Sequence, residues 1–517
     1  GGEKHNFIKL YMQSNRAFNN VKNIWYTTGE NRALKPGGIR YKGAKIELYE
    51  GHIPPLLRFF HERNISPSGW ISIGEQKENT RKTNCKFEFT TSHLNVNPIF
   101  SDDPVPYKIC SFDIEASSSH GDFPLPMKTY SKLSNEIVDY TNTNNITHEI
   151  FRNILYYAFG LPFSKNIVNV ENISLVYPKT DVTKESIEAK VDKLLNISNI
   201  GAANTQKQNN IETMLHTIDS DDEYDGYKRS KPVEYSNDII SFLNEKKLTK
   251  EDKTTMLNNL LTNYLPEIKG DIVTFIGSTF MNSGSDEVYK NHVIVLNGCH
   301  SLDEEVENSE IVTCNTEREV LLEWTKLIKK EDPDIIIGYN IFGFDYEFMF
   351  IRACQTNCVD RFLQLSRNND EICGTKEKSG EYKIQESISI LASGQHNLKY
   401  INMPGRVQID LYNYFRRDYN LDSYKLDNVA GYFIGDNIKK TEKVGEESTK
   451  IYSKNLYGLA KNSFVHFQEI GHTNEYVENG AKFKIYEINN DDGYFIINKS
   501  LVFNDKKTLR WCLAKDD

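Results

Sequence analysis

The stretch DIIIGYNIFGFDYEFMF, residues 334–350, decides the fold class of this chain. Residues 335–337 are an apolar run typical of a short buried strand. Gly338 and Gly343 suit a sharp turn after that strand, and the apolar residues from Tyr346 onward recur at helical spacing. The segment therefore predicts a strand, a tight turn and a helix that starts at Asp345. The simplest role of an aspartate at that position is a helix N-cap, but such a cap explains neither Asn340 nor the glycines.

The residues before this segment predict an α/β layer fold. A strand-like run opens at residues 105–112, and DIVTFIGSTF (271–280) and NHVIVLNG (291–298) predict two more strands. Thr316 and Glu319 then fit a capping box. An apolar helical stripe follows it and ends at Asp332–Pro333. Strands alternating with helices in this order are typical of an α/β or α+β fold.

The chain divides into two expected parts. Residues 1–104 predict a mostly β unit, with strand-like pieces at LLRFF (56–60), GWISI (69–73) and CKFEFT (85–90). Residues 105–517 predict the α/β unit, interrupted by a polar insertion at about 178–270. That insertion has helical patches at SIEAKVDKLL and DIISFL, and its middle has little to bury and predicts a loop or a disordered segment.

Composition limits the function classes only weakly. The 517 residues carry a net charge of -10 and 38% apolar residues. Neither a signal peptide nor a run of ~20 apolar residues that would span a bilayer is present, so we expect no membrane partner and a chain cut from a longer one. Eight irregularly spaced cysteines predict no disulfide framework and a reducing intracellular compartment, and Cys354 and Cys358 alone do not favour a zinc site. The negative charge argues against a DNA partner, but a metal-dependent nuclease carries acidic ligands of its own.

Three segments hold carboxylates that could act together. In a strand, Asp113 and Glu115 share one face, while their neighbours pack on the other. Asp345 follows the glycine turn. At the end of the chain, LRWCLAKDD (509–517) would place Cys512 and Asp516 on one stripe if it were helical, although the frayed end of a cut chain is an equally good interpretation.

Together, these segments suggest a two-metal site. Asp113, Glu115, Asp345 and Asp516 could bind two divalent ions ~3.5–4 Å apart around a phosphodiester. Carboxylates suit this role because Mg²⁺ prefers oxygen ligands. Alone, each carboxylate is explained equally well by a solvated strand face or a helix cap.

The three segments, in this order, resemble the Exo I, Exo II and Exo III motifs of family B DNA polymerases. Asp113-Ile114-Glu115 resembles the D-x-E of the first motif, and Asn340 to Asp345 resembles the N-x-x-x-F-D of the second. The stretches DPDIIIGYNIFGFDYEF (332–348) and MPGRVQIDLYNYFRRDYNLDSYKLDNVAGYFIGD (403–436) extend the likeness. FFHERNISPSGWISI (59–73) resembles the amino-terminal domain of polymerases from large nucleocytoplasmic DNA viruses.

The resemblance implies a ribonuclease-H-like 3′→5′ proofreading exonuclease, with a mixed sheet flanked by helices, that uses two Mg²⁺ or Mn²⁺ ions. It implies that Asp113 bridges both metals, that Glu115 and Asp516 hold the metal with the nucleophilic water, and that Asp345 holds the other. It also implies that the 3′-terminal nucleotide is positioned by three further residues, Asn340, Phe344 and Phe123.

The third motif departs from the family pattern. Family members usually have Y-x-x-x-D there, and aligning on Asp516 puts Cys512 at the Tyr position. The resemblance then implies a slower exonuclease, or another group in the role of the Tyr hydroxyl. Neither the D-x-x-S-L-Y-P nor the Y-G-D-T-D-S motif of nucleotide addition is found, so we expect polymerisation to belong to a parent protein.

The resemblance also implies partners and a place of action. The partners are primer–template DNA, single-stranded 3′ ends and a sliding clamp bound through the rest of the parent. The place is the nucleus or a viral replication site in the host cytoplasm. Two alternatives remain open: a free-standing DnaQ-like exonuclease, and a non-catalytic DNA-binding module with a decayed nuclease fold.

Overall fold

A computed structural model describes residues 5–28, 32–118, 121–164, 169–197, 200, 238–285, 287–300, 308–391, 394–421, 423–471, 474–503 and 507–514. The chain separates into two compact units. The first comprises residues 1–82 and 86–104, and the second comprises residues 83–85 and 105–517. None of the helices in the described ranges is both long enough and apolar enough to cross a membrane.

In its described residues, the first unit combines short strands with two α-helices. β3 (Trp70–Ile73) pairs with β6 (Val96–Ile99), and β5 (Phe89–Thr90) pairs with β4 (Lys77–Glu78). A further hairpin joins β1 (Ile39–Tyr41) and β2 (Ala44–Ile46), and α1 spans Asn15–Lys22. The strand prediction for LLRFF is wrong, because these residues lie in helix α2 (Pro55–Arg63). Pro55 stands in the first turn, where its fixed φ and missing N–H favour helix initiation.

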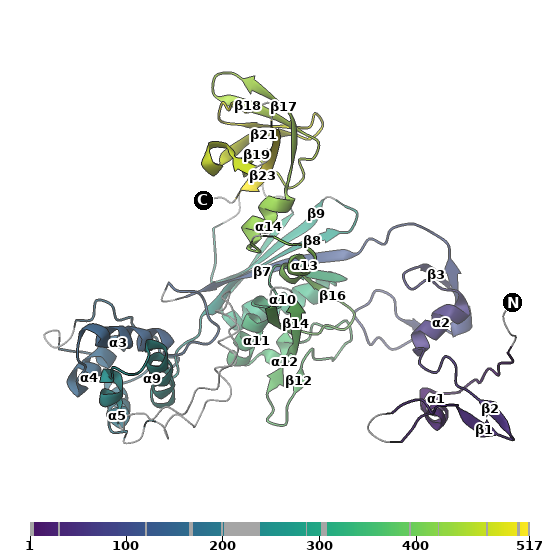
Figure 1. Ribbon diagram of the computed structural model, residues 1–517, viewed down its shortest axis with the longest axis horizontal. Helices are drawn as coiled ribbons and strands as arrows, with labels where there is room; N and C mark the ends of the chain where they lie inside the picture. The colour runs from purple at the N-terminus through teal and green to yellow at the C-terminus, as the bar shows by residue number, and fades with distance from the viewer. Residues whose placement is uncertain are drawn as a thin grey trace. The chain divides into compact units, whose positions relative to one another are not determined.

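The second unit is built around a mixed sheet, which in the described residues has six strands in the order β10-β9-β8-β7-β11-β16 (Figure 1). β7 pairs antiparallel with β8, and β8 with β9, whereas β11 runs parallel to both β7 and β16. The bounds are β7 Lys108–Ser117, β8 Ile272–Asn282, β9 Val288–Leu296, β10 Ser309–Cys314, β11 Ile335–Gly338 and β16 Val407–Asp410. The predicted mixed sheet is therefore confirmed.

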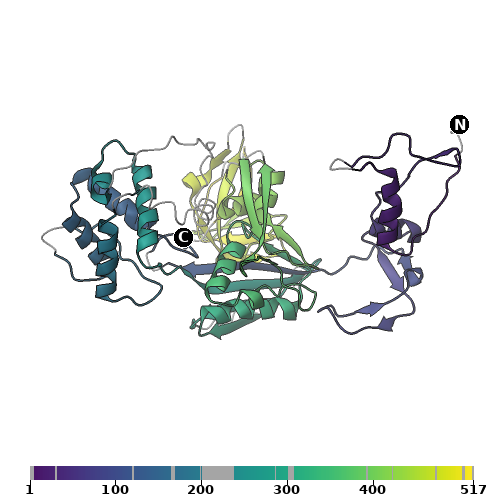
Figure 2. The ribbon, with the colours of Figure 1, turned by 90° about the horizontal axis from the view of Figure 1, so that it is seen from below.

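Helices α10 (Glu317–Glu331) and α11 (Asp345–Gln355) bury the apolar face of this sheet (Figure 2). The predicted capping box is present, with the Thr316 hydroxyl accepting the Glu319 N–H and the Glu319 carboxylate accepting N–H groups at the cap. Trp324 lies fully buried on α10, with its ring centroid 5.0 Å from that of Phe112 on β7. α12 (Val359–Phe362) closes the same core.

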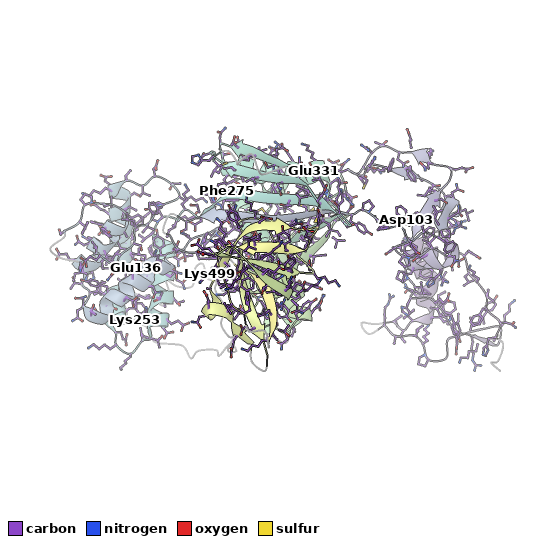
Figure 3. The ribbon with its side chains drawn as sticks, turned by 90° about the horizontal axis from the view of Figure 1, so that it is seen from above. Asp103, Glu136, Lys253, Phe275, Glu331 and Lys499 are labelled. Carbon is purple, nitrogen blue, oxygen red and sulfur yellow. The ribbon has the colours of Figure 1, made fainter. Side chains whose placement is uncertain are left out.

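A helical subdomain with its own core is inserted between β7 and β8. It contains α3 (Ser131–Thr143), α4 (His148–Ala158), α5 (Lys184–Leu195), α8 (Ile239–Asn244) and α9 (Lys250–Tyr264). Figure 3 labels Glu136 and Lys253 within it. The predicted helical patches correspond to α5 and α8, but the core also includes α3 and α4, so the helical subdomain begins before residue 178. The expected loop between α5 and α8 lies, over residues 201–237, outside the described residues.

Two hairpins and two short helices follow α12. The hairpins are β12–β13 (Thr375–Lys376, Tyr382–Lys383) and β14–β15 (Gln385–Leu391, Gly394–Tyr400). After β16 come α13 (Leu411–Asp418) and α14 (Leu426–Phe433). The rings of Phe415 on α13 and Phe433 on α14 are in contact, tilted by 33°, with their centroids 4.8 Å apart.

The last part of the described chain is a β-barrel. Its strands are β17 Gly435–Val444, β18 Ser448–Ser453, β19 Phe464–Ile470, β20 Asn474–Tyr476, β21 Phe483–Asn489, β22 Tyr494–Ile497 and β23 Thr508–Ala514. The order β19-β21-β22-β18-β17-β23 closes on itself because β23 also pairs with β19. Fully buried Trp511 fills the barrel and donates its indole N–H to Ser453 Oγ at 2.9 Å.

Of the two interpretations left open for residues 509–516, a helix or a frayed end, neither holds over the described part. Residues 508–514 form strand β23, in which Cys512 pairs with Gly435 on one side and His466 on the other. Trp511 and Cys512 are both buried. In the closed barrel, the backbone N–H and C=O groups of these residues form hydrogen bonds with neighbouring strands. This long-range pairing overrides the helical spacing of the apolar side chains.

Candidate active site

The first two predicted carboxylates lie on β7, in the middle of the mixed sheet. Asp113 and Glu115 are exposed on the outer face, while Phe112 and Ile114 are buried on the inner face against α10 and α11. The alternation follows directly from the two-residue period of a strand. β7 therefore presents two carboxylates on the face of the sheet opposite α10 and α11.

Asp345, the first residue of α11, lies beside this pair. Its side chain is 2% exposed, and its Oδ1 accepts the backbone N–H of Ile114 on β7 at 3.3 Å. It is not the N-cap, because Phe344 holds the cap position and makes no side-chain capping bond. The helix start thus places Asp345 next to Asp113, although 231 residues separate Asp345 from Ile114.

The charge state of Asp345 is strongly perturbed. Burial, the charge of Asp113 and a hydrogen bond between the two carboxyl groups together raise the pKa of Asp345 to about 8, with burial the largest cause. Two adjoining carboxyl groups of this kind retain a proton between them unless a cation takes its place. The pair is therefore a fitting place for a divalent ion.

Among the described residues, no further ligands for a metal ion are arranged around the pair of Asp113 and Asp345. In the described part of the chain, no group of three or more His, Cys, Asp or Glu side chains is arranged to hold a metal ion. Asp113 and Asp345 form a pair, and Glu115 lies two residues further along the face of Asp113. Such a pair suits Mg²⁺, which is often bound by one or two carboxylates together with substrate phosphates and water.

A strained turn precedes Asp345. Asn340 adopts the left-handed conformation (φ 62°), and its carbonyl accepts the N–H groups of Gly343 and Phe344, both at 2.9 Å. A Cβ on Gly343 would lie 2.3 Å from Asn340 Oδ1, so a larger residue here would displace the Asn340 side chain. The turn therefore fixes Asn340, Phe344 and Asp345 relative to one another.

Asp410 holds this turn, and sequence reasoning missed it. Asp410 ends β16, opposite Gly338 of β11, and is 3% exposed. Its carboxylate accepts the N–H groups of Asn340 (2.9 Å) and Phe342 (3.1 Å). It also caps α13 through the Tyr412 N–H (2.9 Å) and the Asn413 amide (2.8 Å). An aspartate between the strand VQI and the helix LYNYF indicated the cap, but nothing in the sequence indicated the bonds to Asn340 and Phe342.

The structure brings Phe123 and Phe344 together. Their ring centroids lie 5.5 Å apart, and Phe123 is 59% exposed. Buried Asp271, at the start of β8, accepts the Leu125 N–H (2.8 Å) and donates its own N–H to the Leu125 carbonyl (2.9 Å). These bonds anchor the segment that carries Phe123, so the two rings form an aromatic pair in the second unit.

The residues of the predicted third motif are in a different setting. Cys512 lies in the barrel with 2% exposure, and burial raises the pKa of its thiol. The thiol therefore lies between two barrel strands. Asp516 lies outside the described residues, and the helical stripe that supported its role is absent over residues 508–514.

A mixed sheet flanked by helices, with carboxylates from its central strand and from a helix start, defines a protein of the ribonuclease-H-like nuclease class. The family model described as "DNA polymerase family B, exonuclease domain" matches residues 46–154 and 254–429, more than half of the chain. The chain therefore belongs to DNA polymerase family B and contains its exonuclease domain. Helices α5 and α8 of the helical subdomain and the whole barrel fall outside the match.

Named proteins that are similar to this chain are DNA polymerases. The chain is 38% identical to a DNA polymerase of Phaeocystis pouchetii virus, over 99% of the chain and 52% of that protein. It is 33% identical to a DNA polymerase of Pyramimonas orientalis virus, over 100% of the chain and 39% of that protein. A DNA polymerase delta catalytic subunit of Dictyostelium discoideum is 36% identical over 33% of the chain and 14% of that protein. The chain spans about half or less of the length of these relatives.

Proposed function

We propose that this chain carries the 3′→5′ proofreading exonuclease of a family B DNA polymerase, and that the whole protein copies DNA. The observation that carries the proposal is the contact between Asp113 and Asp345 inside the matched exonuclease domain. Asp113 is exposed on β7 and Asp345 is buried beside it. Their mutual repulsion disfavours both charges in the absence of a cation, and a metal-dependent phosphodiesterase needs such a pair.

Asp113 and Asp345 would hold a divalent ion between them, and Glu115 would extend the ligand set along β7. Bound Mg²⁺ or Mn²⁺ supplies an activated water and stabilises the departing 3′-oxygen. The backbone N–H of Ile114 keeps the Asp345 carboxylate directed at the β7 strand.

The aromatic pair would seat the DNA end. Phe123 and Phe344 present apolar faces on which the 3′-terminal base can stack, and stacking on an aromatic ring contributes ~1–3 kcal/mol per base without sequence preference. Asn340, which has a left-handed backbone conformation, belongs to the turn that carries Phe344 and would contact the same nucleotide. Proofreading requires binding without sequence preference because any of the four bases can be misincorporated.

The ligand set is not extended to Cys512, which is buried in β23. The metal-binding role of Asp516 stays a prediction, and trimming of DNA by an Asp516→Ala variant of the full-length protein would test it. The proposed partners are primer–template DNA and single-stranded 3′ ends, with a sliding clamp bound through other parts of the polymerase. The proposed place of action is an intracellular DNA replication site, either the nucleus or a viral replication site in the host cytoplasm.

The test is trimming of 5′-labelled single-stranded DNA by the full-length protein in Mg²⁺. We expect Asp113→Ala with Glu115→Ala to reduce trimming at least 1,000-fold. Asp192→Ala, which removes an exposed carboxylate of α5, should leave it unchanged. Trimming that persists in the double variant would refute the assignment. DNA binding by a wild-type protein that never trims would instead support a non-catalytic module.

A further inference from the structure

Gly277 occupies the middle of the sheet face opposite α10 and α11. It lies in β8 and pairs with Asp113 of β7 on one side and with Val293 of β9 on the other. Directly paired residues of antiparallel strands point to the same face. Gly277 therefore belongs to the face that carries Asp113, whereas its neighbours Ile276 and Ser278 are buried on the helix-covered face.

The fold gives no reason for a glycine here. The backbone of Gly277 is not in the left-handed region, and a Cβ built at this position would meet no atom within 4 Å. Glycine weakens the interior of a strand, since it adds conformational entropy to the unfolded chain and offers no side chain to pack. Folding alone would favour a β-branched or aromatic residue at the centre of β8.

A glycine that neither backbone geometry nor packing requires often marks a place where a ligand approaches the backbone. We infer that Gly277 keeps the sheet surface beside Asp113 free for the 3′-terminal nucleotide of DNA, which contacts the β8 backbone there. Val293 and Phe275, the latter opposite Glu115 and labelled in Figure 3, border this bare surface with partly exposed apolar side chains. The inference rests on the proposed exonuclease function and names a substrate-contacting position within it.

The test adds bulk at Gly277 without removing any group. In the full-length protein, we expect Gly277→Val to lower kcat/KM for trimming of single-stranded DNA at least tenfold, mainly through a higher KM. Affinity for a fluorescein-labelled oligonucleotide, measured by anisotropy in Ca²⁺ to prevent hydrolysis, should fall by a similar factor. Resistance to urea should be unchanged or higher, because valine is the better strand residue.

Thr279→Ile is the matched control. Thr279 lies two residues further along the same face of β8, opposite Ser111 rather than Asp113. The control should trim and bind DNA within twofold of wild type. Gly277→Ala, with a smaller addition, should give an intermediate loss and provides the measurement if the valine variant fails to fold.

The outcomes separate this inference from the proposed function. If wild type trims DNA and both Gly277 variants trim and bind it equally well, the Gly277 inference is wrong while the exonuclease stands. An equal loss in Thr279→Ile would also contradict it, because the effect would then not be local to Asp113. A wild-type protein that shows no metal-dependent trimming would refute the proposed function itself.

Discussion

Asp410→Asn tests whether one buried carboxylate positions the candidate site. In the wild type, Oδ1 accepts the N–H groups of Asn340 and Tyr412, and Oδ2 accepts those of Phe342 and the Asn413 amide. An asparagine keeps one acceptor oxygen but turns an NH₂ group toward the other two donors. Leaving a buried donor without its acceptor costs about 1–3 kcal/mol, so we expect a loss of roughly 2–4 kcal/mol in the free energy of unfolding.

The same change should reduce catalysis by more than its effect on stability explains. Asn340 and Phe342 belong to the turn that sets Phe344 and Asp345, and a displacement of about 1 Å can cost about 100-fold in rate. We therefore expect single-turnover trimming by folded Asp410→Asn to fall by roughly 10- to 100-fold. A 2-aminopurine at the 3′ end of the DNA should also report weaker stacking on Phe344, through fluorescence closer to that of free DNA.

Asp436→Asn is the control for a purely structural effect. Asp436 Oδ2 also accepts several donors, namely the Lys454 and Asn455 N–H groups and the Ser453 hydroxyl, but it lies in the barrel. This variant should lose a comparable free energy of unfolding and trim DNA at the wild-type rate. The reasoning is refuted if Asp410→Asn keeps wild-type trimming and 2-aminopurine fluorescence, or if Asp436→Asn slows trimming equally.

Three further predictions concern metal binding and the framework. Mg²⁺ at 10 mM, for a Kd on the order of 1 mM, should stabilise the wild type by about 1.4 kcal/mol in thermal unfolding. Asp345→Asn should lose this shift, and a preserved shift would place the ion elsewhere. Glu317→Ala should cost about 3–5 kcal/mol in urea unfolding, because it leaves the buried Arg352 guanidinium without its paired carboxylate; a loss under 1 kcal/mol would contradict this. Thr316→Ala should cost about 1 kcal/mol by removing the α10 cap, and Thr316→Ser should recover most of it.

Local sequence signals predicted the secondary structure correctly wherever the long-range strand pairing agreed with them. The capping box at Thr316 and the strand alternation around Asp113 both appear in the structure. At two places the local pattern and the structure differ, for different physical reasons. At LLRFF, the apolar run is strand-like, but the preceding Pro55 favours the start of a helix. At residues 508–514, helical spacing was overruled by pairing with strands that start more than 40 residues earlier in the chain.

By itself, the sequence determined the alternation of strands and helices in a layer fold, the shared face of Asp113 and Glu115, and the turn that leads to Asp345, because each follows from a local period or a glycine position. The mixed sheet was implied by the resemblance to family B polymerases. Only the tertiary structure decided that Asp345 meets the β7 strand, that Asp410 holds the turn, and that Gly277 lies bare opposite Asp113. These relations depend on the register between strands and on the packing of a helix start against a sheet, which are contacts between distant residues that no local pattern encodes.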